Sequence, residues 1–388
     1  MERKYKICGI TTKAVTIKWF MLENLKYSGD YGFSPYVICE PTTIFDKENM
    51  GDVKYIPVPM NRGNVSVGEV IRSVWKIYKI CRREKFDIIQ YASSNAGLYA
   101  SLAGWMARVP VRVYCQWGIS YTDFCGLKMW FYKAIEKVTC LFSTNVQPDS
   151  LGNLKFAIEE KLYSPRKGNV IYNGSACGVD LQKFNREHRE EWRHSVREKY
   201  GIEESMKVFG YVGRLALEKG VNELFKAYLT ITNKNTKLLL VGPYYGLDEL
   251  DQEALERARA DENVIFVGPV DNPAEFYAAM DFLILPSYRE GFGMVVVEAG
   301  AVGTPSIVTN IIGPTEYVKD LHNGLYCEVK STDSLVSAME RALQMSDKDY
   351  YRLCENAYQD ALTKFDCFEY RKKFLEDRKR LIKYDKHV

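Results

Sequence analysis

The feature that most constrains the fold is a repeated alternation of short apolar runs with longer amphipathic stretches. In the first half the runs are KYKICGI, PYVICE, VKYIPVP, FDIIQY, VRVYCQW and CLFSTNV, and in the second they are KVFGYVG, TKLLLVG, NVIFVG, DFLILP and PSIVTN. Their β-branched residues and flanking Gly and Pro favour strands, whereas the stretches between them favour helices. Strands that alternate with helices predict parallel sheets covered on both faces.

The strand series pauses at residues 168–184, GNVIYNGSACGVDLQKF, which are rich in turn residues. A charged helical stretch follows, and a new series starts at Lys207. Because 388 residues are too many for one ordinary core, we expect two doubly wound domains, over 1–175 and 176–365. A ligand cleft would then lie between the carboxyl ends of their strands. Residues 366–388 have the spacing of an amphipathic helix, either solvated at the surface or packing back on the N-terminal domain.

Charge and cysteine usage exclude several classes of protein. The net charge is only +3 and no nucleic-acid motif is present, so nucleic acid is a poor partner. The ten cysteines include no C-x-x-C pair, and no apolar signal core opens the chain, which favours reduced thiols in the cytoplasm. The four histidines show no ligand-like pairing, so we expect no protein zinc site. No run approaches the roughly 20 apolar residues that span a bilayer.

Two cations follow the run KVFGYVG, which leads into Gly213. Arg214 directly follows this glycine and Lys219 comes five residues later, before a helical run. Gly213 lets a ligand approach the backbone closely, Arg214 can fork two hydrogen bonds to a phosphate, and Lys219 adds a point charge. At the strand-end edge of a nucleotide-binding type of sheet, such a pair suits a diphosphate. The alternative is two surface charges near a turn, with Glu218 neutralising one of them.

The stretch SYREGFGMVVVEAGAV sets two carboxylates in contrasting surroundings. Glu290 lies on a Gly-punctuated turn, and Glu298 lies about two turns into an apolar run that we expect to form a short helix. The N–H groups of residues 291–293 at the helix N-terminus would form an anion site. Glu290 could accept hydrogen bonds from sugar hydroxyls, and a buried Glu298 needs donors such as a ribose diol. Taken singly, each is more simply a loop acid or a buried acid capped by local backbone.

Together these motifs resemble a retaining glycosyltransferase of family 4, with the GT-B fold. The resemblance rests on the E-x7-E pair Glu290 and Glu298, on GRLALEKG, on FVGPV and on LPSYREGFG, and is strongest over residues 205–330. The segments ITTKAVTIKWF, GLKMWFYKAIEKVTCL and NGSACGVD are similar to bacterial enzymes that assemble capsular polysaccharide or O-antigen on a polyprenyl carrier. The implied fold is α/β, with two doubly wound Rossmann-like domains and an interdomain cleft. The N-terminal domain would bind the acceptor and the C-terminal domain the nucleotide-sugar.

The resemblance also implies roles for individual residues. Arg214 and Lys219 would hold the donor diphosphate, Glu298 would bind the ribose hydroxyls, and Glu290 would contact the donor sugar. The other implied donor-binding positions are Gly213, the base contacts Gly268 and Val270, and the backbone around Phe292, Gly293 and Met294.

The implied mechanism is front-face displacement with retention, in which the departing phosphate assists the incoming hydroxyl. Neither glutamate then needs to be a covalent nucleophile, in contrast to a glycosidase pair. Arg214, Lys219 and the helix N-terminus would stabilise the leaving diphosphate without a metal ion or cofactor. The only D-x-D, Asp347–Lys348–Asp349, has a charged helical context and is expected to be a solvated helix start.

The first domain departs from the family pattern. Many relatives carry a Gly-Gly turn and a histidine near the sugar, where this chain has Cys8–Gly9 and Gln116–Trp117–Gly118. We expect Gly9, Gln116 and Trp117 near the acceptor cleft, with Asp123 as an accessory residue. Gln116 could hydrogen-bond a sugar hydroxyl, and Trp117 could either stack on a sugar ring or belong to the core.

A basic helix is expected in the run VIRSVWKIYKICRREKF. Arg72, Lys76, Lys79 and Arg83 recur at steps of four, three and four, which lines them along one face beside apolar and aromatic residues. Such a face could dock on anionic lipid headgroups, or it could be the solvated face of an ordinary domain helix. Docking would make the protein cytoplasmic and peripheral on the inner face of the plasma membrane.

The leading hypothesis is therefore a retaining hexosyltransferase of surface polysaccharide biosynthesis. Its donor would be a nucleotide-sugar, UDP-linked in preference to GDP-linked, and its acceptor a saccharide on a polyprenyl diphosphate. One alternative is a nucleotide-sugar epimerase on the same fold, which the scarcity of histidines near the cleft motifs disfavours. Another is a non-catalytic partner subunit of a transferase, which would not need all four of Arg214, Lys219, Glu290 and Glu298. A dinucleotide oxidoreductase is weaker still, because the first strand leads into CGITTK rather than a G-x-G-x-x-G turn.

Overall fold

The computed structural model describes residues 3–385, except for 62–65, 234 and 245. The chain divides into two compact units. The first unit comprises Met1–Cys177 and Phe368–Val388, and the second comprises Gly178–Cys367. Each has its own sheet and core, and each is described by itself below.

The first unit is built on a parallel sheet in the order β3-β2-β1-β4-β5-β6. The strands are β1 (Tyr5–Ile10), β2 (Phe33–Cys39), β3 (Lys54–Pro57), β4 (Ile88–Ala92), β5 (Val111–Gln116) and β6 (Asn145–Pro148). Five strands coincide with apolar runs of the first half of the sequence, whereas β6 overlaps the sixth run, CLFSTNV, only at its last two residues, because Cys140–Phe142 end a helix.

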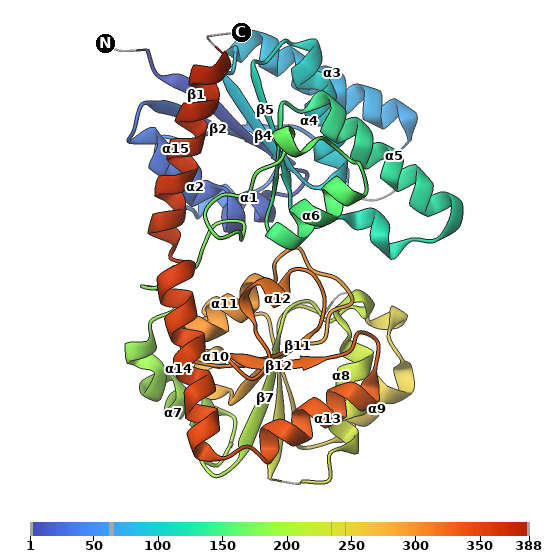
Figure 1. The fold of residues 1–388 in the computed structure, drawn as a ribbon, viewed down its shortest axis with the longest axis vertical. Helices are drawn as coiled ribbons and strands as arrows, with labels where there is room; N and C mark the ends of the chain where they lie inside the picture. Colours follow the sequence, from blue (N-terminus) through green and yellow to red (C-terminus); the bar gives the residue numbers. More distant parts are fainter. Residues whose placement is uncertain (1–2, 62–65, 234, 245, 386–388) are drawn as a thin grey trace. The chain divides into compact units, whose positions relative to one another are not determined.

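Helices cover both faces of this sheet (Figure 1). They are α1 (Ala14–Phe20), α2 (Leu22–Gly29), α3 (Val67–Glu84), α4 (Ser94–Met106), α5 (Gly126–Phe142), α6 (Leu151–Glu159) and α15 (Cys367–Asp385), with 3₁₀ turns η1 (Ile44–Asp46), η2 (Ser120–Asp123) and η3 (Pro165–Lys167). Because successive strand residues point to opposite faces, Ile88 packs with α1, α2 and α15, whereas Ile89 packs with α3, α4 and α5. The alternation of apolar runs and amphipathic helices is thereby explained.

Helix α15 is an integral part of the first unit. Phe374 and Leu381 are buried in the core that α1 and α2 share, and α15 runs beside α2 (Figure 1). The guanidinium of Arg378 is buried, donates two hydrogen bonds to Oε1 of Gln90 at 3.1 and 2.9 Å, and pairs with Asp377 at 2.6 Å. The interpretation of this segment as a solvated surface helix is therefore wrong, because its inner face is buried and its polar groups are satisfied by the sheet.

The second unit repeats the plan, with parallel strands in the order β12-β11-β10-β7-β8-β9. The strands are β7 (Lys207–Val212), β8 (Thr236–Val241), β9 (Val264–Gly268), β10 (Phe282–Leu285), β11 (Ser306–Thr309) and β12 (Gly324–Cys327). The helices are α7 (Arg189–Lys199), α8 (Val221–Thr230), α9 (Gln252–Ala260), α10 (Pro273–Ala279), α11 (Met294–Ala301), α12 (Pro314–Tyr317), α13 (Thr332–Leu343) and α14 (Asp347–Lys364), with 3₁₀ turns η4 (Arg186–His188), η5 (Leu217–Lys219) and η6 (Leu247–Glu249). Strand β12 does not correspond to any of the five apolar runs predicted as strands in the second half of the sequence.

Both sheets have the doubly wound order of a Rossmann-like domain. In the second unit the chain moves outward from β7 through β8 to β9, and then returns to the other side of β7 with β10. The strand order therefore reverses between β7 and β10. In open α/β sheets such a switch point is where ligands bind, because the loops after the two strands diverge at the carboxyl edge. The expected α/β fold with two Rossmann-like domains is confirmed.

Candidate functional site

The candidate site lies at the carboxyl edge of the second sheet, where the loops after β7 and β10 meet. The backbone N–H of Tyr288, in the loop after β10, donates to the carbonyl of Glu218, in the loop after β7, at 3.0 Å. The hydroxyl of Tyr288 also donates to both carboxylate oxygens of Glu223 on α8, at 2.8 and 2.9 Å. These bonds hold the two motif-bearing loops against each other.

The loop after β7 carries the two expected phosphate-binding cations. Gly213 stays in register with the sheet, since its N–H donates to the carbonyl of Val241 at 2.9 Å. Nη2 of Arg214 lies 2.8 Å from Oε1 of Glu218, so the predicted neutralising contact is present. Burial would raise the pKa of Glu218, but its own backbone N–H and the Arg214 guanidinium together lower it below the usual value.

Lys219 and Glu290 form the central contact of the site. Nζ of Lys219 lies 2.6 Å from Oε1 of Glu290, and both side chains are largely buried. The hydroxyl of Ser287 donates to the same Oε1 at 2.7 Å. The structure therefore brings the cation expected at the diphosphate and the acid expected at the sugar to one point.

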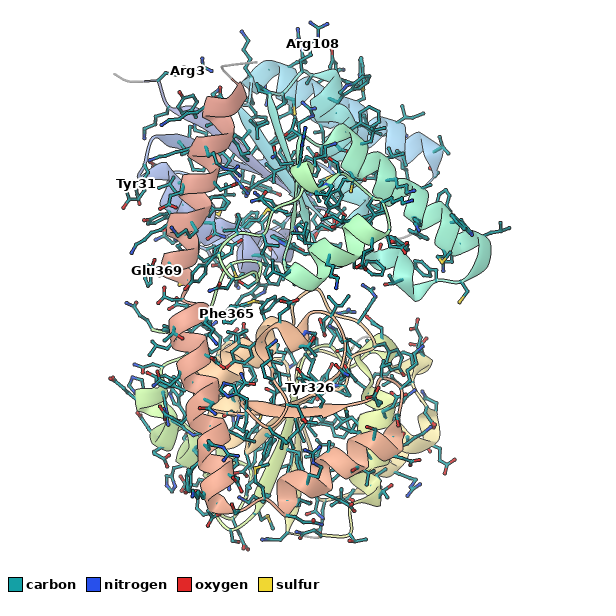
Figure 2. The ribbon with its side chains drawn as sticks, viewed as in Figure 1. Arg3, Tyr31, Arg108, Tyr326, Phe365 and Glu369 are labelled. Carbon is teal, nitrogen blue, oxygen red and sulfur yellow. The ribbon has the colours of Figure 1, made fainter. Side chains whose placement is uncertain are left out.

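The turn before α11 has the geometry of an anion-binding helix start. Gly293 precedes the helix with φ +83°, which favours glycine, and a Cβ there would lie 3.2 Å from Leu285. The first N–H groups of α11, from Met294 on, have no acceptor within the helix. The ring of Phe292 is buried against Phe365, which is labelled in Figure 2, with ring centroids 5.4 Å apart. Phe292 therefore offers only its backbone to a ligand.

Glu298 is the fifth residue of α11 and so lies about one turn into the helix, not two as expected. Its Oε2 accepts a hydrogen bond from the buried Tyr277 hydroxyl at 2.8 Å. Burial raises the pKa of Glu298 above its usual value, although the Tyr277 hydrogen bond and the charge of Lys183 act in the opposite direction. A carboxylate in this position gains from further hydrogen-bond donors.

The end of β9 holds the two expected base contacts. Gly268 ends the strand with φ +84°, and its carbonyl accepts from the N–H of Gly242 at 2.8 Å. Val270 is half-buried against the core of the second unit. The ring of Tyr244 lies near this turn and 6.3 Å from the ring of Phe266, and it remains partly exposed.

Three residues of the second unit were missed by the sequence analysis: Ser287, Tyr277 and Tyr244. Ser287 lies three residues before Glu290 in the same stretch, a spacing that could have suggested the contact. Tyr277 comes from a different helix, and no local signal in the sequence links it to Glu298. Tyr244 follows the strand run TKLLLVG closely enough that its place at the sheet edge was foreseeable.

In the first unit, the expectation for Gln116 is wrong. Its side chain is 0% exposed, with Nε2 donating to Oε1 of Glu136 at 2.5 Å and Oε1 accepting from Tyr163 at 3.0 Å. Tyr114 donates to the other oxygen of Glu136 at 3.1 Å. Both polar atoms of the Gln116 amide thus make hydrogen bonds within a buried network, and the buried side chain is not available to a sugar.

Gly9 is also explained by packing. It lies inside β1, and a Cβ there would lie 3.0 Å from Leu25 and 3.1 Å from Met21, so the glycine allows close helix–sheet contact. Its expected place near the acceptor stays a prediction. Trp117 is half-buried, with its ring 5.4 Å from that of Phe20. Asp123 ends η2, and its side chain lies outside the described part of the structure.

The basic face of α3 is present as predicted. Arg72, Lys76, Lys79 and Arg83 are all exposed, and Ser66 and Glu69 form a reciprocal capping box at the helix start. Nζ of Lys79 lies 5.5 Å from the centre of the Trp75 ring. Whether this face binds lipid stays a prediction.

The described residues include neither a candidate metal cluster nor a candidate membrane span. Within them, no cluster of three or more His, Cys, Asp or Glu side chains suited to a metal ion occurs. No helix in the same described part is long and apolar enough to cross a membrane. Asp347 and Asp349 lie in the first turn of α14, where Ser346 caps the helix, as expected for a helix start.

Comparisons with known proteins add independent findings. Residues 193–360 match the family model described as glycosyl transferases group 1, and residues 7–150 match the model described as glycosyl transferase 4-like. The chain is 27% identical over 289 residues to the capsular polysaccharide biosynthesis glycosyltransferase CapM of Staphylococcus aureus, covering 74% of each chain. It is 26% identical over 298 residues to the UDP-Gal:alpha-D-GlcNAc-diphosphoundecaprenol alpha-1,3-galactosyltransferase of Escherichia coli, covering 73% of each.

Solved structures share the architecture. A crystal structure of a glycosyltransferase from Rickettsia africae superimposes with a TM-score of 0.79 at 18% identity, covering 98% of this chain and 99% of that one. A structure of Anabaena Alr3699/HepE in complex with UDP and glucose gives 0.78 at 19% identity, covering 97% and 100%. At these identities the likeness establishes the fold.

Proposed function

This chain belongs to the glycosyltransferases, with a glycosyl transferase 4-like domain followed by a group 1 domain, and from that premise we propose a specific reaction for it. It transfers a hexose from a nucleotide-sugar, which we take to be UDP-linked, to a saccharide on a polyprenyl diphosphate carrier. The transfer retains the configuration of the donor sugar and needs no metal ion. The product contributes to a surface polysaccharide such as capsule, O-antigen or exopolysaccharide.

The acceptor class is supported by the names of relatives. The Escherichia coli relative is named for a diphosphoundecaprenol-linked acceptor. A Campylobacter jejuni relative, 24% identical over 315 residues, is named for an N,N'-diacetylbacillosaminyl-diphospho-undecaprenol acceptor. A carrier of this kind is lipid-bound, so we propose that the protein works as a peripheral protein on the cytoplasmic face of the membrane. The exposed basic face of α3 would attract anionic headgroups there.

The observation that carries the donor-site proposal is the contact of Lys219, Glu290 and Ser287 at the switch point. An ammonium at that position can neutralise a diphosphate bound above the sheet edge. Arg214 can join it by exchanging Glu218 for a phosphate, because the guanidinium fork suits either partner. These two cations and the first N–H groups of α11 supply the positive charge that a metal ion would otherwise provide.

The remaining donor contacts follow from the same edge of the sheet. Glu298 accepts hydrogen bonds from the ribose hydroxyls, in addition to the one from Tyr277. The base rests against the turn at Gly268 and Val270, where the ring of Tyr244 can stack on it. Glu290 contacts the sugar itself.

Retention follows from a front-face displacement. The bond between the anomeric carbon and the diphosphate oxygen breaks, and its electron pair leaves with the diphosphate. The acceptor oxygen forms the new bond from the same face, and its proton passes to the departing phosphate oxygen. Glu290 is a poor candidate for a covalent nucleophile because Oε1 already accepts from Lys219 and Ser287. Its role in this proposal is to hold the sugar and to orient Lys219.

Calorimetric titration with UDP, GDP and ADP tests the donor assignment. We expect UDP to bind most tightly, and Glu298→Ala to weaken that binding by roughly tenfold or more. Preference for GDP would overturn the choice of nucleotide, and binding of none of the three would overturn the donor site. Transfer of a radiolabelled sugar to an undecaprenyl-diphosphate saccharide, with EDTA present, then tests the reaction and its metal independence. An anomer-specific NMR spectrum of the product tests retention.

A further inference from the structure

The outer face of α5 carries an apolar stripe that the protein itself does not cover. Leu127 is 90% exposed, and Trp130 and Phe131 are each 62% exposed. Ala134 and Leu141 continue the exposed set. These residues recur at i, i+3, i+4, i+7 and i+14, which aligns them along one side of the helix. Apolar and aromatic side chains of this size, gathered in one exposed stripe, indicate an interaction surface.

The opposite side of α5 fixes the orientation of that stripe. Glu136, Thr139 and Cys140 are buried against the sheet, and Glu136 bonds to the buried Gln116. Because Glu136 is the only carboxylate on α5, the exposed side of the helix bears none. The stripe is therefore not an alternative core face that a small rotation could bury.

Lysines flank the stripe on both sides. Lys128 and Lys137 are exposed, and Lys133 pairs with Glu160 while its Nζ lies 5.6 Å from the centre of the Trp130 ring. At 100° per residue, Lys128 lies to one side of the stripe, and Lys133 and Lys137 lie to the other. The surface is thus apolar at its centre and basic at its margins.

The neighbouring helix extends the apolar surface. Trp105, near the end of α4, is half exposed and packs on Phe142 of α5 with ring centroids 4.9 Å apart. Helices α3, α4 and α5 form one layer on the same face of the first sheet (Figure 1). That layer also includes the exposed Trp75 on α3 and the basic face around it.

We propose that the stripe of Leu127, Trp130 and Phe131 inserts into the headgroup region of an anionic membrane. Tryptophan favours the boundary between headgroups and acyl chains, and lysines beside an apolar stripe can reach anionic headgroups while the stripe is buried. A second copy of this chain is a poorer occupant. A two-fold contact through the stripe would bring Lys128 and Lys137 of both copies together without an exposed carboxylate on either α5.

This inference rests on the proposed function, because a lipid-linked acceptor requires the protein to reach the membrane. It adds that membrane binding is divided between two helices. The basic face of α3 provides long-range attraction, which salt screens, whereas α5 provides insertion, which salt affects little. The two contributions differ in their dependence on lipid charge. They can therefore be separated without any sugar substrate.

Flotation with lipid vesicles tests the assignment. The full chain is mixed with vesicles of about equal parts phosphatidylglycerol and phosphatidylcholine, without nucleotide-sugar, at low and high salt. We expect Leu127→Ser/Trp130→Ser/Phe131→Ser to reduce the bound fraction by roughly tenfold or more at both salt concentrations. Leu151→Ser/Tyr351→Ser, which alters exposed apolar residues on α6 and α14, should bind as the wild type does.

A second measurement detects insertion directly. Lipids brominated in the acyl chains should quench the tryptophan fluorescence of the wild type. Trp130→Phe should lose the part of that quenching that Trp130 contributes while still binding vesicles, since Trp105 and Trp75 remain. Wild-type binding by the triple variant would overturn the proposal, as would a wild-type dimer in solution that the triple variant dissociates. The proposed function can fail separately. If the vesicle results hold and no sugar is transferred to a lipid-linked acceptor, docking stands and the reaction is wrong.

Discussion

Lys219 and Glu290 lie 71 positions apart in the sequence, yet Nζ of one is 2.6 Å from Oε1 of the other. They meet because β7 and β10 are neighbours in the sheet, with Phe209 paired to Phe282. The loops that follow these strands therefore start side by side at the carboxyl edge. An ammonium and a carboxylate that hold each other in this way are already oriented before a charged ligand arrives.

Replacing Glu290 by Gln tests whether this contact serves the reaction. The substitution keeps the size of the side chain but removes the charge that orients Lys219, so we expect kcat to fall by roughly 100-fold or more. The thermal midpoint should change little. Glu256→Gln, at an exposed position on α9, is the matched control and should retain full turnover. A Glu290→Gln enzyme with wild-type kcat would show that the carboxylate has no part in the transfer.

Glu218 competes with a phosphate for Arg214. Since Nη2 of Arg214 lies 2.8 Å from Oε1 of Glu218, binding of a diphosphate must break or share that ion pair. We expect Glu218→Gln to bind UDP about twofold more tightly, because an exposed ion pair of about 0.5 kcal/mol no longer has to be exchanged. Calorimetry with UDP measures the difference. Weaker binding would mean that Glu218 positions Arg214 rather than competing for it.

Tyr277 partly offsets the effect of burial on the pKa of Glu298. Its hydroxyl donates to Oε2 at 2.8 Å and opposes the rise that burial causes in the pKa of Glu298. In Tyr277→Phe the pKa of Glu298 should rise further, so the protonated form persists to higher pH. If the ribose binds to the ionised carboxylate, UDP affinity should fall as the pH is lowered through this raised pKa, and should fall earlier in Tyr277→Phe. Titrations at pH 5.5, 6.5 and 7.5 give the two curves, and coincident curves would contradict the role of Glu298.

Local sequence predicted most of the fold because parallel strands buried on both faces leave a strong signal. The runs KVFGYVG and DFLILP are apolar after their first residue and end in Gly or Pro, and the structure has β7 and β10 there. Strand β12 was missed because Gly324–Cys327 follows His322 and Asn323, which favour a turn. It pairs only with β11, at the edge of the sheet. An edge strand needs fewer apolar residues, so its signal is weak.

The candidate site was predictable in its members but not in its contacts. Which loops meet depends on the order of strands across the sheet, and that order is set by long-range packing. Gln116 is a second example of a residue whose contacts depend on long-range packing. Its place where many relatives carry a histidine suggested a sugar-facing residue, yet it shares a face with Tyr114, two residues earlier, and Glu136 from α5 meets both. Period-two alternation could have paired Gln116 with Tyr114, but only the fold supplies Glu136.

Gly220 sets the distance between the two loops of the site. It has φ +69°, and a Cβ there would lie 2.0 Å from the carbonyl oxygen of Pro286. We expect Gly220→Ala to lower the free energy of unfolding by about 3–5 kcal/mol, through backbone strain and displacement of Pro286. Gly201→Ala is a matched control, since Gly201 has φ +62° and no atom within 4 Å of the added Cβ. It should cost only about 1 kcal/mol. Urea denaturation compares them, and equal losses would mean that the contact with Pro286 is not limiting.

Glu136 should make the stability of the protein depend on pH. Burial raises its pKa from 4.5 to about 7, although hydrogen bonds from Gln116 and Tyr114 oppose the rise. Because the folded state holds this proton more tightly than the unfolded state, the resulting stabilisation is fully present below about pH 4.5. It is lost as the pH rises through 7. The shift corresponds to about 3 kcal/mol between those limits.

Glu136→Gln keeps the hydrogen-bonding partners and removes the titration. We therefore expect the wild type to lose stability relative to this variant as the pH is raised from 5 to 8, with urea denaturation as the measurement. Glu159→Gln, at an exposed position in the same unit, should follow the wild type at both pH values. A constant difference between wild type and Glu136→Gln across that range would mean that Glu136 keeps an ordinary pKa. The buried network of Gln116, Tyr114 and Tyr163 would then have to hold a carboxylate rather than a carboxylic acid.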